Sequence, residues 1–236
     1  GRINSATSRL RRLGETLPLD PAGRHIAYMT ELQGLRRERL YTPEFRGLVG
    51  ESVVDDVVRR RWRESTATDL LDLLLDTDTG TYLPDDLLAK VDIATMACSL
   101  EGRSPLLDHE FMQFAASLPA NLKVNGTQKK VALRKALRGW VPDEILDAPK
   151  RGFQPPLAEW FRGELRDLSR DVLLDGAARA RGYFDTGYVR QMLDEHERGA
   201  SDHSQGIWTL LTFELWHREF VDGPAFSAGS PAVTVS

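Results

Sequence analysis

The stretch YLPDDLLAKVDIATMACSLEGRSPLLDH, residues 82–109, carries the strongest structural signals in this chain. The pair Leu83-Pro84 places a proline where the first turn of a helix tolerates it, so a long helix is predicted through Ser99. Another helix is predicted from Pro105 to Leu118. These two helices form the middle of the chain.

The pattern outside this stretch is also helical. Runs of alternating β-branched residues, which are typical of strands, are almost absent, so we expect an all-α chain. A strongly basic helix is predicted from Gln128 to Trp140, and Thr77 to Gly80 is expected to break the leucine-rich helix before it. Residues 147–156 are rich in Pro and Gly and are predicted to form a loop.

One helical unit is expected over residues 1–222. Residues 223–236 are small, polar and rich in Pro and Gly, so they are predicted to be a disordered tail. Further helices are predicted at Pro21 onwards, Thr42-Pro43 onwards, Glu51–Trp62, Thr68–Leu75, Leu157–Leu174, Tyr188–Arg198 and Ser204–Phe220.

Composition excludes several classes of protein. The 236 residues carry 31 Lys and Arg against 35 Asp and Glu, a formal charge of -4, which gives no overall attraction for nucleic acid or an anionic membrane. No apolar run approaches the roughly 20 residues of a membrane-spanning helix. The single cysteine, Cys98, fits a reducing compartment such as the cytoplasm, and is expected to be a buried structural thiol.

The 82–109 stretch resembles the C-terminal signature of the asparagine synthetases. About ten fixed positions recur in order, among them the YLPDD start, the K-x-D pair, the SLE-x-R turn and the P-x-LD end. Two further pieces follow at similar spacing: KVALR at residues 130–134, and PKRGF with two prolines at residues 149–156. The resemblance covers roughly Thr42 to Phe220.

The resemblance implies a fold and a reaction. The chain would be the helical C-terminal portion of an α/β, adenine-nucleotide alpha-hydrolase-like (ATP-pyrophosphatase) domain. Enzymes of this family use ATP and Mg²⁺ to adenylate the side-chain carboxylate of aspartate. Ammonia, taken from glutamine or used free, then displaces AMP to give asparagine. The implied partners are these small molecules and the N-terminal remainder of the same protein, with a second copy as the candidate partner in a homodimer.

Lys130 aligns with the lysine that faces the phosphate chain in this family, where it would stabilise the charge of the adenylation transition state. Lys129 takes its place if the register shifts by one. Asp92 is a candidate for lining the active cleft. Lys150 and Arg151 are candidates for binding the departing pyrophosphate from a mobile loop. A solvated face remains the alternative for the other basic residues near Lys130, and Arg134 is expected to make a structural ion pair.

Three signature residues are assigned to structure. Glu101 and Arg103 are expected to form an ion pair across the turn, and Asp108 is expected to act as a helix N-terminal carboxylate. Two positions depart from the family pattern: Ile93 stands where a basic residue is common, and Gly102 replaces the usual alanine, which should loosen the turn slightly.

Two segments of the family pattern are absent. The sequence contains neither the SGG-x-D-S loop that cradles pyrophosphate nor the SGEG-x-DE segment whose carboxylates hold Mg²⁺. The chain is therefore expected to be cut just after the second segment, to bind neither ATP nor Mg²⁺ alone, and to be inactive alone. Without the parallel strands of the missing half, exposed apolar helix faces are expected.

Several alternatives stay open. β-Lactam synthetases and lasso-peptide cyclases use the same adenylating scaffold, and a non-catalytic helical interaction module would also lack the nucleotide loops. Nucleic-acid binding would rest on the basic residues around Trp62, which acidic neighbours dilute. Metal binding is not expected, because His196 and His203 lack a third ligand. The basic residues around Trp62 are Arg59, Arg60, Arg61 and Arg63.

Overall fold

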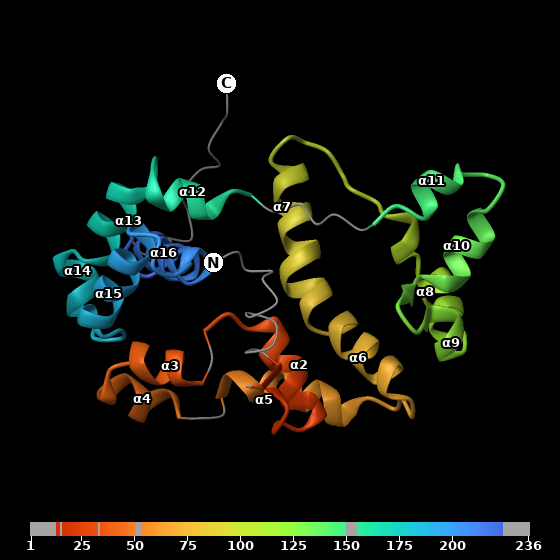
Figure 1. The fold of residues 1–236 in the computed structure, drawn as a ribbon, viewed down its shortest axis with the longest axis horizontal. Helices are drawn as coiled ribbons and strands as arrows, with labels where there is room; N and C mark the ends of the chain where they lie inside the picture. Colours follow the sequence, from red (N-terminus) through yellow and green to blue (C-terminus); the bar gives the residue numbers. More distant parts are fainter. Residues whose placement is uncertain (1–12, 15, 33, 51–52, 150–154, 224–236) are drawn as a thin grey trace, which may run out of the picture. The chain divides into compact units, whose positions relative to one another are not determined.

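The computed structural model describes residues 13–14, 16–32, 34–50, 53–149 and 155–223 (Figure 1). The predicted tail lies almost wholly outside the described residues. The described chain is helical apart from one two-stranded sheet, as the all-α prediction requires. It separates into two compact units: a terminal unit, Gly1–Val53 with Gln154–Ser236, and a central unit, Val54–Phe153.

The terminal unit contains helices from both ends of the chain. They are α2 (Pro21–Met29), α3 (Leu35–Leu40), α4 (Pro43–Val49), α12 (Leu157–Arg162), α13 (Arg166–Leu173), α14 (Gly176–Ala180), α15 (Thr186–Glu197) and α16 (Ser204–Phe220). The predicted helix from Leu157 to Leu174 is in fact two helices, since Gly163 ends α12. The prediction for α16 matches its observed bounds.

Capping side chains start several of these helices. Thr42, Asp175 and Asp185 each accept a hydrogen bond from a backbone N–H of the first turn, which satisfies a donor that the helix itself cannot pair. Proline follows Thr42 at the first position of α4, where its missing N–H costs nothing. Local sequence therefore defines where these helices begin.

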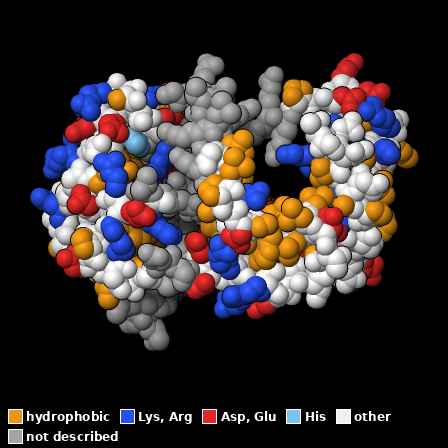
Figure 2. Space-filling view, turned by 60° about the horizontal axis from the view of Figure 1, so that its bottom comes forward, with side chains coloured by type: hydrophobic (Ala, Val, Ile, Leu, Met, Phe, Trp, Pro, Cys, Tyr) orange, Lys and Arg blue, Asp and Glu red, His pale blue; other side chains and the backbone are white. Residues whose placement is uncertain are grey.

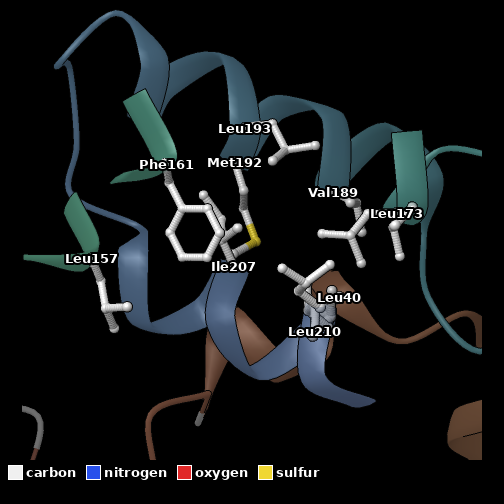
Figure 3. Close-up of a cluster of buried hydrophobic side chains, with 11 residues drawn as sticks. Leu40, Leu157, Phe161, Leu173, Val189, Met192, Leu193, Ile207 and Leu210 are labelled. Carbon is white, nitrogen blue, oxygen red and sulfur yellow. The ribbon is translucent and has the colours of Figure 1, made fainter. Parts of the chain in front are cut away.

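The core of the terminal unit joins distant parts of the sequence. Leu40 belongs to the same buried cluster as Phe161 and Met192, and the side chains of Phe161 and Met192 point toward one another in Figure 3. α13 and α12 both pack against α16 and α15. The backbone N–H of Asp185 donates to the Leu40 carbonyl at 2.7 Å, so the α3–α4 segment is fixed to the chain 145 residues later. The whole cluster comprises Leu40, Leu157, Phe161, Val172, Leu173, Val189, Met192, Leu193, Ile207, Leu210 and Leu211.

The central unit carries the 82–109 signature. Its elements are α5 (Val53–Glu64, which begins at the unit boundary), α6 (Leu70–Thr79), the π-helix η1 (Leu83–Leu88), α7 (Ala89–Met96), the 3-10 helix η2 (Pro105–Leu107), α8 (His109–Ser117), α9 (Ala120–Lys123), β1 (Val124–Asn125), β2 (Gln128–Lys129), α10 (Val131–Leu137) and α11 (Asp143–Leu146).

Several helix predictions in this unit were wrong at their ends. The helix predicted through Ser99 ends at Met96, and the one predicted from Pro105 to Leu118 is divided at Asp108 into η2 and α8. α6 continues through Thr77 to Thr79. The hydroxyls of Thr77 and Thr79 donate to the carbonyls four residues back at 2.7 Å, so both hydroxyls find their partners within the helix. The basic helix begins at Val131 and ends at Leu137, and does not span 128–140. Its first predicted residues form a hairpin with β1 instead.

Few apolar side chains are buried in the central unit. Of its described hydrophobic residues only Val131 and Leu146 are buried, and hydrophobic side chains form broad orange areas on the surface in Figure 2. Val91, Ile93 and Met96 of α7, and Phe111 and Phe114 of α8, are among the exposed ones. The expected exposed apolar helix faces are therefore present.

Candidate active-site segment

The long helix of the signature has an irregular first half. The Ala89 N–H donates to the Pro84 carbonyl five residues back, which marks η1 as a π-helix, a form that often occurs at functional sites. Lys90 forms an i,i+4 ion pair with Asp86 at 3.5 Å. Asp92 is exposed, and its carboxylate makes no hydrogen bond or ion pair with the described residues.

The SLE step of the signature ends this helix. Ser99 has φ 58°, in the left-handed region, and the Leu100 N–H donates to the Thr95 carbonyl at 3.0 Å. This i to i-5 bond is that of a Schellman motif, in which glycine usually takes the left-handed position. The neighbouring Cys98 is exposed, so the prediction of a buried thiol was wrong: α7 ends at Met96, and Cys98 lies in the turn that follows it.

The turn after the helix is held by polar contacts at the surface. The Arg103 Nη2 lies 2.8 Å from the Glu101 Oε1, with both side chains exposed, so the pair contributes at most about 1 kcal/mol. Asp108 accepts a hydrogen bond from the Phe111 N–H at 3.0 Å and caps α8. These are the contacts expected from the sequence for the three residues, and they involve only neighbouring groups.

The hairpin places Lys130 directly before a helix. Val124 pairs with Lys129 and Asn125 with Gln128, around a two-residue loop whose first residue, Gly126, has φ 57°. Glycine at that loop position suits a tight hairpin turn. The glycine at the first position of the Gly126-Thr127 loop was the sequence signal for it.

Lys130 follows as the N-cap of α10, with φ 57° and ψ 42°. It is therefore not on a rigid helix, as the sequence suggested, but in a left-handed backbone conformation that costs a non-glycine residue about 1–2 kcal/mol. Strain of this kind persists only where the surroundings enforce it. The Lys130 side chain is exposed and its ammonium has no hydrogen bond or ion pair with the described residues.

The other basic side chains nearby are mostly occupied. Lys123 donates to Asp72 Oδ1 at 2.6 Å and to the Ala116 carbonyl at 2.7 Å, with its side chain only 12% exposed, so it is not part of a solvated face. Arg138 hydrogen bonds to Asp147 and Asp143, and these bonds raise the pKa of its guanidinium. Lys135 is exposed.

Arg134 makes the structural contacts expected of it, and more. Its Nη1 lies 3.8 Å from Asp147 Oδ1 and donates to the Leu146 carbonyl, while its Nε donates to the Lys129 carbonyl at 3.1 Å. Arg134 and Arg138 thus connect α10 to the end of α11. The sequence did not reveal this arrangement, although two arginines four apart, followed by acidic residues, are consistent with it.

The remaining candidates are not brought together by the described contacts. No hydrogen bond or ion pair joins Asp92 to Lys130 in the part of the chain that the structure describes. Lys150 and Arg151 lie outside the described residues. No group of three or more His, Cys, Asp or Glu side chains among the described residues gathers to hold a metal ion.

The alternative sites from the sequence analysis are engaged in structural contacts. His196 is buried, and its Nδ1 accepts a hydrogen bond from the His203 backbone N–H at 3.1 Å. In the basic cluster around Trp62, Arg61 donates to Asp76 Oδ1 at 2.6 Å. None of the helices in the described ranges has the length and apolar character needed to cross a membrane.

Comparison with known proteins identifies the family. The family model for asparagine synthase matches residues 2–218. This chain belongs to the asparagine synthase family. The signature, the exposed lysine before α10 and the structural roles of its arginines are therefore features of an asparagine synthase segment.

Named relatives agree with this assignment. A putative glutamine-hydrolysing asparagine synthetase of Mycobacterium bovis is 42% identical over 71% of this chain and 26% of its own length. Glutamine-hydrolysing asparagine synthetase 1 of Bacillus subtilis is 35% identical over 69% of this chain and 25% of its own. The chain thus spans about a quarter of the length of these relatives. No solved structure matches it.

Proposed function

We propose that this chain supplies the helical part of the synthetase site of a glutamine-dependent asparagine synthetase. In the reaction, an aspartate side-chain carboxylate oxygen attacks the α-phosphorus of ATP and pyrophosphate leaves. Ammonia, released from glutamine by hydrolysis to glutamate, then attacks the acyl carbon, and AMP leaves with the bond electrons. The proposal includes the α/β adenine-nucleotide alpha-hydrolase-like fold for the complete domain.

The observation that carries the proposal is the state of Lys130. Lys123, Arg134 and Arg138 of the same region are held by carboxylates or carbonyls, whereas the ammonium of Lys130 is exposed and has no hydrogen bond or ion pair with the described residues. A cation that is fixed at its backbone and unpaired at its tip can meet the charge that develops on a phosphate chain. We assign this role to Lys130.

The nucleotide-binding loops would come from outside this chain. Neither SGG-x-D-S nor SGEG-x-DE occurs in the sequence, and the relatives are about four times longer than the matched part. Among the described residues no group of three or more carboxylates gathers as a metal site. Mg²⁺, when bound with the nucleotide, would supply charge neutralisation at the phosphates. We also propose that the exposed apolar faces of the central unit pack against that other part of the enzyme.

The remaining candidates have supporting roles. Asp92, exposed on α7, would line the cleft, and Lys150 and Arg151 would bind the departing pyrophosphate. The 236-residue chain alone is predicted to be inactive, and the enzyme is proposed to work in the cytoplasm, with a homodimer as its possible state.

A specific departure from the family pattern favours a second candidate substrate. Ile93, where a basic residue is common, is 70% exposed, and it would offer no charge to a substrate carboxylate. An amide-forming enzyme that adenylates another carboxylic acid, such as a β-lactam synthetase-like or lasso-peptide cyclase-like one, would fit that change. Comparing pyrophosphate release with aspartate and with other carboxylic acids separates the two.

The catalytic role is tested by Lys130→Ala in the full-length enzyme that carries this segment. Removal of a transition-state cation should cost roughly 2–4 kcal/mol, or about 30- to 1000-fold in the rate of pyrophosphate release. Lys135→Ala is the matched control, because it removes the same charge from an exposed site on α10, the helix that Lys130 precedes. A normal rate of pyrophosphate release in Lys130→Ala would refute the assignment of the catalytic role to Lys130. If Lys129→Ala lowered that rate instead, the role would belong to Lys129.

A binding measurement tests whether ATP binding requires the two segments that are absent from this sequence. Calorimetric titration of ATP with Mg²⁺ into the 236-residue chain should show no binding. Micromolar affinity would mean that a nucleotide site exists without the two absent segments. The full-length enzyme is the positive control, and failure of that enzyme to bind ATP would favour a non-catalytic helical module.

A further inference from the structure

The backbone of Lys130 is the least ordinary feature of the candidate segment. Lys130 and Ser99 are the two non-glycine residues with positive φ in the described part of the chain. Ser99 belongs to a common helix-ending motif, whereas Lys130 joins a strand to the start of a helix. The direction in which its side chain leaves the backbone depends on this left-handed step.

The conformation of Lys130 is set by the two peptide groups on either side of it. The first contains the Lys129 carbonyl and the second contains the Lys130 carbonyl. Arg134 bonds to both: its side-chain Nε donates to the Lys129 carbonyl at 3.1 Å, and its backbone N–H donates to the Lys130 carbonyl at 2.9 Å. One residue therefore fixes both planes between which the φ and ψ angles of Lys130 are measured.

The guanidinium of Arg134 is itself anchored at its other end. Its Nη1 donates to the Leu146 carbonyl and lies 3.8 Å from the Asp147 carboxylate, and the side chain is 34% exposed. A planar guanidinium can donate to two carbonyls in fixed directions at once, which an ammonium on a flexible stem cannot reproduce. The contacts with α11 thus hold the Nε in place against the Lys129 carbonyl.

We propose that Arg134 is the positioning residue of Lys130 in the adenylation reaction. It keeps the left-handed step before α10 and so directs the Lys130 ammonium, without touching the substrate itself. This inference rests on the proposed function of Lys130. It goes beyond the structural ion pair expected from the sequence, because it assigns Arg134 an effect on catalysis that acts through one other residue.

The kinetic test is a double-mutant cycle in the full-length enzyme, with Arg134→Lys, Lys130→Ala and the two combined. Arg134→Lys should lower kcat for pyrophosphate release about 10- to 100-fold and change the KM for ATP by less than about threefold. In the Lys130→Ala background the same substitution should have almost no further effect, because there is no ammonium left to direct. Full additivity of the two losses would overturn the proposal.

The matched control is Arg138→Lys. Arg138 lies one turn further along α10 and also binds Asp147, but it makes no contact with the peptide groups around Lys130. Arg138→Lys should leave kcat within about twofold of the wild-type value. An equal loss in Arg138→Lys would mean that any weakening of the α10–α11 connection matters, and would overturn the specific role of Arg134.

A structural readout on the 236-residue chain separates this inference from the proposed function. In Arg134→Lys, hydrogen exchange of the hairpin amides in residues 124–129 should become at least about fivefold faster, and in Arg138→Lys it should not. Unchanged exchange and unchanged kcat in Arg134→Lys, with a slow Lys130→Ala enzyme, overturn the positioning role alone. A normal rate in Lys130→Ala overturns the proposed function, and the positioning role with it.

Discussion

In the terminal unit, Leu40, Ile207 and Leu210 are 1%, 1% and 2% exposed, whereas in the central unit Leu106 and Trp140 are 55% and 87% exposed. Both units are built from helices, and some helices in each begin with a capping side chain, as at Thr42 in the terminal unit and Asp108 in the central unit. The difference lies in long-range contacts, which bring α3 beside α15 in the terminal unit. The unit that carries the family signature is the one that buries few of its described apolar side chains.

Ion pairs show the same contrast. The Arg181 Nε lies 2.8 Å from Glu214 Oε2, and these side chains are 10% and 5% exposed. The Arg103–Glu101 pair of the signature has the same distance, with 84% and 67% exposed. Burial opposes ionisation of Glu214, but hydrogen bonds from Arg181 and Arg218 hold the pKa of its carboxyl below the usual value. An Arg–Glu ion pair of the same length is therefore expected to contribute more to stability in the terminal unit than in the central unit.

The largest loss of folding stability should come from Glu214→Ala. This change leaves two arginines of the terminal unit without their shared buried carboxylate, and breaking such an arrangement costs about 3–5 kcal/mol. Hydrogen exchange of the core segments in α12, α15 and α16 measures the loss for this unit alone.

The matched substitution in the central unit is Glu101→Ala. Its exposed pair should contribute less than about 1 kcal/mol. Equal losses for the two substitutions would contradict the view that burial, and not distance, separates the two pairs.

A second effect should appear on acidification. His196 is 1% exposed; burial lowers its pKa below 6.5 in spite of the hydrogen bond between its Nε2 and the Ala158 carbonyl. The folded unit therefore holds the imidazole neutral where the unfolded chain would bind a proton. Its contribution to stability is complete above pH 6.5 and is lost as the pH falls toward the folded-state pKa, by at most about 1.4 kcal/mol per pH unit.

Urea unfolding or core hydrogen exchange between pH 7.5 and 5 measures this slope. His196→Gln should flatten it, although that variant is less stable at every pH. The slope should persist in His109→Gln, because His109 is an exposed residue of the central unit. A wild-type slope in His196→Gln would assign the acid sensitivity to the neighbouring carboxylates Asp202 and Glu195, whose pKa values are lowered in the folded unit.

The smallest predicted change is a gain in the stability of the central unit, in Gly102→Ala. A Cβ at Gly102 would lie 3.7 Å from Thr95 Oγ1 and 3.8 Å from Val91 Cγ1, which is ordinary contact, and no left-handed φ forbids it. Gly102→Ala should stabilise the central unit by about 0.4–1 kcal/mol, mainly by restricting the unfolded chain. Exchange of the amides in α7 and α8 measures it. Destabilisation would show that the signature turn needs a glycine.

Helix placement was predictable wherever local signals act alone. Thr42-Pro43 and Ser204–Phe220 were located from sequence because capping residues and apolar spacing act within a few residues. The start of α10 was missed, since the basic residues favour helix while Gly126 in the Gly126-Thr127 loop favours a hairpin. Only the pairing of β1 with β2 decides between the two. The burial of Cys98 was predicted wrongly, because a helical sequence pattern does not show whether another part of the chain packs over a given residue.

The sequence by itself determined the family, the helical class and the identity of Lys130 as the candidate cation, because these depend on residue types in a fixed order. The tertiary structure decided which basic side chains remain without a partner. Lys123, Arg134 and Arg138 resemble Lys130 in sequence, yet each is bound to groups between 5 and 51 residues away. Such contacts depend on how the chain folds back on itself, and no local pattern of charge specifies them.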